Sequence, residues 1–174
     1  MGSPKILIVE DDDYQAGWLV FVLQRVFPES EVQLCETESQ FQITFPLIAV
    51  TNPPDIVIMD IMLRWQNHGQ DIRVPYIIEK ESFYRAGFRC QKSISIVLPD
   101  TPVIMYSCLE LSDIAMDLMY TPQNVSYVSK CIDPTILLNR IVTLLNLDPT
   151  QDLDHKIASG GSCYHDFANL LYFS

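Results

Sequence analysis

Polar residues stand directly after short apolar runs in this chain, and together they could carry out phosphoryl chemistry. Glu10 and Asp11 follow the first run, and Asp60, Ser107 and Lys130 each follow a later one. Carboxylates brought together repel one another unless a cation balances them, and oxygen ligands of this kind suit Mg²⁺. Lysine and serine side chains can hold phosphoryl oxygens, and an aspartate can accept a phosphoryl group as an acyl phosphate.

The apolar runs themselves predict the strands of a parallel sheet. Short runs rich in β-branched residues are typical of strands that are buried on both faces. We expect strands over residues 5–9, 31–35, 55–59, 102–106 and 125–128. Because sites in such sheets lie beyond the carboxyl ends of the strands, this fold would bring the polar residues together.

Between the strands, apolar residues recur at helical spacing, which predicts helices on both faces of the sheet. Pro46 is expected to interrupt or close the second helix, and residues 61–80 show no clean period. Asp133 and Pro134 match a helix cap followed by proline at the first helical position. The expected helices cover residues 14–27, 41–50, 81–95 and 111–119, and a final segment with Leu137, Leu138, Ile141, Leu144 and Leu145.

Composition limits the classes of protein that the chain can represent. Its 174 residues favour one domain, and 22 acidic against 11 basic residues give a formal charge of -11. Such a surface repels phosphate backbones and anionic lipids, so we expect neither direct nucleic-acid binding nor membrane association. With no signal peptide and no CxxC pair, the chain is expected to be cytoplasmic. Its cysteines are interpreted as reduced core or incidental thiols: Cys35, Cys90, Cys108, Cys131 and Cys163.

Four segments together resemble the signature strands of receiver domains, the CheY-like response-regulator modules of two-component signalling systems. They are ILIVEDD (6–12), PDIVIMD (54–60), PVIMYS (102–107) and YVSK (127–130), in the order that the family has them. The resemblance implies an α/β fold: a five-stranded, doubly wound parallel sheet of flavodoxin-like order 2-1-3-4-5, with helices on both faces. It places the receiver domain at residues 4–148 and leaves 149–174 as a tail without a separate output domain.

The resemblance also assigns roles to individual residues. Asp60 would be the phosphoacceptor, and Lys130 and Ser107 would hold the phosphoryl group. Ser107 and Tyr127 match the family's switch pair of a hydroxyl and an aromatic side chain. The implied Mg²⁺ ligands are Glu10, Asp11, Asp60 and the backbone carbonyl of Met62.

As a stand-alone receiver, the chain would act as a phosphorylation switch and not as an enzyme, with at most slow self-dephosphorylation. Its implied partners are a sensor histidine kinase or phosphotransfer protein and a downstream protein target, and a homodimer is compatible with the family. The residues two beyond the phosphoacceptor and two beyond the switch hydroxyl are Met62 and Leu109. Both are apolar and cannot orient an attacking water, so we expect a long-lived phosphorylated state.

The chain departs from the family pattern near the expected site. Cys131 stands where a proline often follows the lysine, and Arg64 stands where a proline often follows the phosphorylated strand. The stretch from Asp60 to Ser107 is longer than usual, with an extended segment over about 64–80. That segment could be a lid, a docking loop or a tolerated insertion.

Other interpretations of these residues remain open at this point. The acidic run 10–13 could simply cap a helix, and a phosphorylation-independent pseudo-receiver could use the same fold as an interaction module. Asp11 and Asp13 also have the spacing of haloacid-dehalogenase-type phosphatases, although Gln15 and Asp60 do not fit that motif. In the tail, Cys163, His165 and Asp166 could bind a metal, and the apolar residues Phe167, Leu170, Leu171, Tyr172 and Phe173 could pack on the body or bind a partner.

Overall fold

A five-stranded parallel sheet forms the centre of the molecule. The computed structural model describes residues 3–67, 69, 73–131 and 133–147. The strand order is β2-β1-β3-β4-β5, which confirms the doubly wound topology expected from the sequence. Each expected strand lies within one residue of an observed one: β1 (Lys5–Val9), β2 (Glu31–Cys35), β3 (Ile56–Met59), β4 (Val103–Ser107) and β5 (Val125–Ser129).

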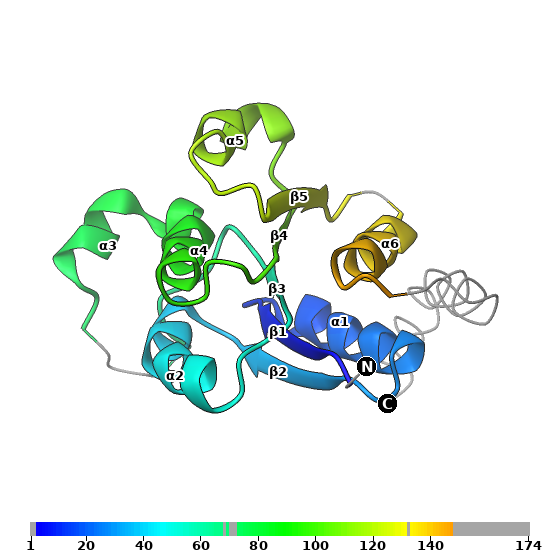
Figure 1. Cartoon of the computed structure of the whole chain (residues 1–174). Helices are drawn as coiled ribbons and strands as arrows, with labels where there is room; N and C mark the ends of the chain where they lie inside the picture. Colours follow the sequence, from blue (N-terminus) through cyan, green and yellow to red (C-terminus); the bar gives the residue numbers. More distant parts are fainter. Residues whose placement is uncertain (1–2, 68, 70–72, 132, 148–174) are drawn as a thin grey trace, which may run out of the picture.

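Helices cover both faces of this sheet (Figure 1). On one face lie α1 (Asp13–Val26) and α6 (Pro134–Leu144). On the other lie α2 (Glu38–Thr51), α4 (Ala86–Val97) and α5 (Leu111–Leu118), with the short α3 (Tyr76–Glu81) outside them. The layers explain why the strands are apolar throughout, because both of their faces are buried.

Alternation along β1 shows how the two cores are built. Ile6 and Ile8 pack into the core under α1 and α6, together with Trp18. Leu7 and Val9 point to the other face and pack with Phe41 of α2 and with residues of α4. Successive side chains of a strand point to opposite faces, so one short run serves both cores.

The expectation that Pro46 would interrupt or close the second helix was wrong. α2 begins at Glu38, where Thr37 caps it by accepting a hydrogen bond from the amide of Gln40, and it continues through Pro46 to Thr51. Proline removes one hydrogen bond from a helix. Phe41, Phe45 and Ala49 are buried on the inner face of this helix, and that packing holds it together.

The expected helix over 81–95 was wrong at its beginning. Ser82 has a positive φ of 68°, and a 3-10 turn (Phe83–Arg85) follows before α4 begins at Ala86. An ordinary residue in the left-handed region cannot continue an α-helix, so Ser82 separates α3 from the next elements. The expected cap at the last helix is confirmed, because Asp133 accepts from the amide of Thr135 and Pro134 occupies the first turn.

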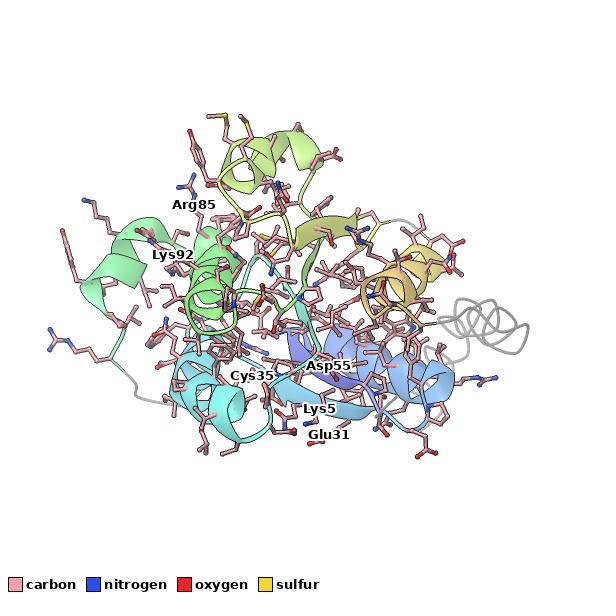
Figure 2. The ribbon with its side chains drawn as sticks, viewed as in Figure 1. Lys5, Glu31, Cys35, Asp55, Arg85 and Lys92 are labelled. Carbon is pink, nitrogen blue, oxygen red and sulfur yellow. The ribbon has the colours of Figure 1, made fainter. Side chains whose placement is uncertain are left out.

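The amino ends of the strands form the edge of the sheet farthest from the candidate site. In Figure 2, the labelled side chains of Lys5, Glu31 and Asp55 gather there. Asp55 accepts a hydrogen bond from the amide of Lys5 at 2.8 Å, and the amide of Glu31 donates to Pro4 at 2.9 Å. These contacts align the beginnings of β1, β2 and β3. The polar residues that follow the opposite ends of β1 and β3 therefore lie at the same level of the sheet.

Candidate acidic site at the carboxyl ends of the strands

Three carboxylates meet where β1 and β3 end. One oxygen each from Glu10, Asp11 and Asp60 lies within 4.8 Å of the others, and Glu10 and Asp60 are buried. The register explains the meeting: Val9 pairs with Met59, so the residues that follow them leave adjacent strands side by side. The amide of Asp60 donates to Val9 at 2.8 Å, which continues the ladder one step past the strands.

Lys130 extends into this cluster from the end of β5. Its ammonium nitrogen lies 2.7 Å from Glu10 Oε2 and 2.7 Å from Asp60 Oδ2, and its side chain is 7% exposed. The amide of Lys130 donates to Ser107 at 2.9 Å, which positions the residue beside the end of β4. The fold therefore brings together two residues that are 120 positions apart in the sequence.

The Asp60 carboxylate is held on both oxygens. Oδ1 accepts from the amides of Ile61 at 2.6 Å and Met62 at 3.3 Å, and Oδ2 accepts from Lys130. These contacts fix the direction in which the carboxylate faces. Met62 is thus adjacent to the site, and the proposed role of its carbonyl as a metal ligand stays a prediction.

The site has more negative than positive groups, and burial makes that imbalance costly. Burial raises the pKa of Glu10 to about 7, against the opposing effect of Lys130, and the charge of Asp60 adds to the rise. Burial also raises the pKa of Asp11. Burial lowers the pKa of Lys130, but the carboxylates of Asp60 and Glu10 outweigh it and keep the pKa above its usual value. The pocket therefore favours an additional cation or proton.

A buried hydroxyl without a partner lies at the end of β4. Ser107 is 0% exposed, and within the described part of the chain its Oγ has no hydrogen-bond partner. An unsatisfied buried hydroxyl costs free energy, and such groups in folded proteins call for an explanation. A ligand oxygen arriving at this edge of the sheet would satisfy it.

Tyr127 is directed toward the loop that follows Ser107. Its hydroxyl donates to the carbonyl of Leu109, and it lies 3.4 Å from the carbonyl of Ser107. The phenol is half-buried. Ser107 ends β4 and Tyr127 lies in the neighbouring β5, and the Tyr127 hydroxyl contacts the loop that follows Ser107. Their switching role stays a prediction.

Arg64 closes one side of the pocket, which the sequence pattern did not reveal. Its amide donates to Asp11 Oδ2 at 2.9 Å, and its guanidinium donates to the backbone carbonyl of Asp11 and lies 3.4 Å from Asp13. A proline here would lack that amide hydrogen. The departure from the family pattern was visible in the sequence, but only the fold shows that it places a cation against Asp11.

Gly87 was also missed, and it allows α4 to approach the site. A Cβ built on Gly87 would lie 2.1 Å from the carbonyl oxygen of Asp60, and the Gly87 amide donates to Ile61 at 2.9 Å. Only glycine fits such a close backbone approach. A single glycine in a helical segment gives no sequence signal for this contact.

The structure separates the alternatives for the acidic residues. Asp12, and not the residues of the cluster, caps α1 by accepting from the amide of Gln15 at 2.9 Å. Asp13 pairs with Arg64 and is not one of the clustered carboxylates, so the phosphatase-like pairing of Asp11 with Asp13 is not formed. The tail residues Cys163, His165 and Asp166 lie outside the described residues.

The donor set fits Mg²⁺ well. Three clustered carboxylates beside the ammonium of Lys130 and the guanidinium of Arg64 provide hard ligands and a surplus of negative charge, which are conditions that favour a divalent cation. Glu10, Asp11 and Asp60 would hold the ion. The buried, unpartnered hydroxyl of Ser107 at the same edge provides a further oxygen group for a ligand.

Comparisons with known proteins agree on the fold. The sequence matches no family model and no curated protein. Solved structures do match: the BeF3-activated DrrB receiver domain is 22% identical with a TM-score of 0.59, covering 84% of this chain and 99% of that one. The HemR receiver domain from Leptospira biflexa is 18% identical, with a TM-score of 0.57 and coverage of 85% and 98%.

A third match has the same architecture. The receiver domain of a DNA-binding response regulator from Colwellia psychrerythraea is 20% identical, with a TM-score of 0.58 and coverage of 82% and 98%. The chain therefore has the CheY-like fold of response-regulator receiver domains. In the part of the chain that the structure describes, no helix is long and apolar enough to cross a membrane.

Proposed function

We propose that this chain is a response-regulator receiver that accepts a phosphoryl group on Asp60 in the presence of Mg²⁺. The observation that carries the proposal is the hydrogen bonding of one buried ammonium group, Lys130, to both Glu10 and Asp60 at the carboxyl ends of the strands. Three carboxylates, Glu10, Asp11 and Asp60, share two cations, Lys130 and Arg64. Here the surplus of carboxylates and the unpartnered Ser107 hydroxyl provide for a ligand that brings both a cation and oxygen acceptors.

The chemistry requires little beyond positioning and charge balance. An Asp60 oxygen attacks phosphorus, a new P–O bond forms, and the bond from phosphorus to the donor nitrogen or oxygen breaks with its electron pair leaving on the donor. Bound Mg²⁺ would neutralise charge on the phosphoryl oxygens. Lys130 already contacts Asp60 Oδ2 and can follow the charge onto a phosphoryl oxygen, while the Ser107 hydroxyl donates to another.

The partners follow from the same chemistry. The donor would be a histidine kinase or a phosphotransfer protein, and the output would be a contact with a protein target. The acidic surface, with a net charge of -11, makes direct nucleic-acid binding an unfavourable output. We propose that the chain catalyses no turnover beyond slow hydrolysis of the acyl phosphate. We also propose that it is located in the cytoplasm.

Mass spectrometry after incubation with acetyl phosphate and Mg²⁺ tests the proposal. The parent should gain one phosphoryl group, and Asp60→Asn should gain none, because it keeps the shape of the side chain and removes the nucleophile. Omitting Mg²⁺ should abolish labelling of the parent. Equal labelling of the variant would refute the assignment of Asp60.

A second candidate is a phosphorylation-independent interaction module. The observation that favours it is Arg64, whose amide and guanidinium occupy the carboxylate and the backbone of Asp11. If Arg64 permanently replaced the metal, the fold would persist without the reaction. The same labelling experiment separates the two functions, because a pseudo-receiver would remain unlabelled at any Mg²⁺ concentration.

A further inference from the structure

Two exposed cysteines flank the candidate site, next to residues proposed to hold the phosphoryl group. Cys108 directly follows Ser107 at the end of β4, and Cys131 directly follows Lys130 beyond the end of β5. Each thiol is thus adjacent in sequence to a residue proposed to hold the phosphoryl group. From the sequence alone, these cysteines are interpreted as reduced core or incidental thiols, because nothing in their spacing relates one to the other.

The fold brings the two thiols together. β4 and β5 are parallel neighbours with Ser107 opposite Ser129, and the amide of Lys130 donates to Ser107 at 2.9 Å. The chain then turns, with the amide of Cys131 donating to Ser129 Oγ at 3.1 Å. The thiols of Cys108 and Cys131 are near enough to interact, and after burial the largest influence that raises the pKa of Cys108 is Cys131. Continued by one residue, this register places Cys108 beside Lys130, one position from Cys131, with the strands about 4.8 Å apart. A disulfide joins Cα atoms roughly 4.4–6.8 Å apart.

The other described cysteines differ in accessibility. Cys35 and Cys90 are buried in the core under α2 and α4. Burial raises the pKa of Cys35, and it raises that of Cys90 well above the usual value. Burial raises the pKa of Cys108 too, so accessibility separates the two groups of thiols. Buried thiols are shielded from oxidants, whereas two exposed thiols beside each other have the arrangement of a redox-sensing pair.

We propose that Cys108 and Cys131 form a peroxide-sensitive disulfide that locks together the two loops bearing Ser107 and Lys130. One thiolate attacks a hydroperoxide, giving a sulfenic acid and releasing the peroxide's other oxygen as water or alcohol. The second thiol then displaces the sulfenic oxygen as water and forms the S–S bond. With hydrogen peroxide, two thiols and one peroxide yield one disulfide and two waters, and a thiol reductant reverses the reaction.

The link would restrict a loop that is already held at one point. The Tyr127 hydroxyl donates to the carbonyl of Leu109, the residue after Cys108. A bond between Cys108 and Cys131 would add a second anchor across the ends of β4 and β5. Ser107 and Lys130 could then no longer adjust independently around an incoming phosphoryl group, so oxidation should slow phosphorylation.

Disulfide formation can be tested without phosphorylation. The full chain carrying Cys163→Ser, which removes a competing thiol, is treated with one equivalent of hydrogen peroxide and then alkylated. Trypsin cleaves after Lys92, Lys130 and Arg140, so the two cysteines fall in separate peptides, 93–130 and 131–140. We expect these peptides to be linked before reduction and separate after it.

Single variants supply the matched controls for this measurement. Cys108→Ser and Cys131→Ser should each abolish the link and leave a sulfenic acid that dimedone traps on the remaining thiol. Cys35 and Cys90 should stay reduced and be alkylated only after unfolding. Separate peptides from the parent, with both thiols alkylated or oxidised individually, would overturn the proposal.

The regulatory part rests on the proposed function and has its own readout. Labelling by acetyl phosphate and Mg²⁺ should be about tenfold slower in the oxidised than in the reduced Cys163→Ser protein, because small misplacements of positioning groups slow transfer strongly. Reduction should restore the rate, and the rate of Cys131→Ser should not respond to peroxide. Equal rates would refute the regulation but leave the disulfide intact. Absence of labelling in the reduced protein would refute the proposed function and the regulation together.

Discussion

Two clusters of buried charge can be compared in this molecule, and they differ in how their charges are balanced. Between α2 and α4, the guanidinium of Arg89 binds both oxygens of Glu38, each at 2.7 Å, and Glu38 is 0% exposed. At the strand ends, one ammonium group contacts two carboxylates and a third lies close by. In the first cluster the buried carboxylate has its own cation, and only the exposed Glu81 shares Arg89 at 3.4 Å. In the second, three clustered carboxylates share the charges of Lys130 and Arg64.

The comparison shows why burial alone does not identify a functional site. Arg89 fixes the segment after β3 by also donating to the backbone of Ser82, and the amides of Glu38 and Ser39 donate to the carbonyls of Arg64 and Trp65. These contacts join the inserted segment to the beginning of α2. A bidentate pair of this kind stabilises structure, and a surplus of like charge indicates ligand binding.

The largest stability effect should come from breaking the complete pair. Arg89→Ala would leave the Glu38 carboxylate buried without its partner, which typically costs about 3–5 kcal/mol. Urea unfolding would measure the loss. Arg85→Ala is the matched control: Arg85 lies between α4 and α5 in Figure 2 and pairs with Asp117 at 3.3 Å, but it is 60% exposed. Its removal should cost less than about 1 kcal/mol, and equal losses would contradict the distinction.

The acidic cluster at the strand ends should instead make the free energy of unfolding depend on pH. The pKa of Glu10 is raised from 4.5 to about 7, so the folded protein holds its proton more tightly than the unfolded chain. Stability should therefore fall as pH rises from about 4.5 to 7, by up to about 3 kcal/mol from this group. Glu10→Gln should flatten that part of the profile in metal-free buffer. Mg²⁺ should reduce the fall in the parent, and an unchanged slope in the variant would contradict the assignment.

The lifetime of the phosphorylated state tests whether apolar residues shield the site. Met62 and Leu109, two residues beyond Asp60 and Ser107, are half-buried, and neither side chain can orient water. Replacing Met62 with Asn and Leu109 with Glu should speed release of inorganic phosphate by about tenfold, equivalent to about 1.4 kcal/mol in barrier height. Phosphate release over time would be followed in both labelled proteins. Equal decay would show that these side chains do not control water access.

The smallest expected effect is on Mg²⁺ affinity, and it concerns Arg64, which contacts Asp11 at the edge of the acidic site. Arg64→Ala keeps the amide hydrogen bond to Asp11 but removes a positive charge, so Mg²⁺ should bind about threefold more tightly, a modest change because the side chain is 31% exposed. Asp11→Ala should weaken binding by removing a ligand. Calorimetric titration with Mg²⁺ would compare the affinities of these two variants. Arg64→Pro would test separately the hydrogen bond from the residue 64 amide to Asp11. Weaker binding in Arg64→Ala would show that its charge does not oppose the ion.

The sequence by itself determined the sheet and the residues at its carboxyl edge. Apolar runs that end in Glu10, Asp60, Ser107 and Lys130 predict both the strands and their meeting point, because parallel strands in a doubly wound sheet place their carboxyl ends along one edge. Strand limits were predictable to within one residue, because a change from apolar to polar residues marks the point where burial ends.

Only the tertiary structure decided the contacts that join distant segments at close range. Nothing in the local sequence shows that Arg64 contacts Asp11, that Gly87 touches the backbone of Asp60, or that Cys108 meets Cys131. The continuation of α2 through Pro46 likewise depends on Phe41 and Phe45 being buried beneath it. Propensity and periodicity describe the chain a few residues at a time, whereas these contacts arise from the packing of elements that the sequence keeps far apart.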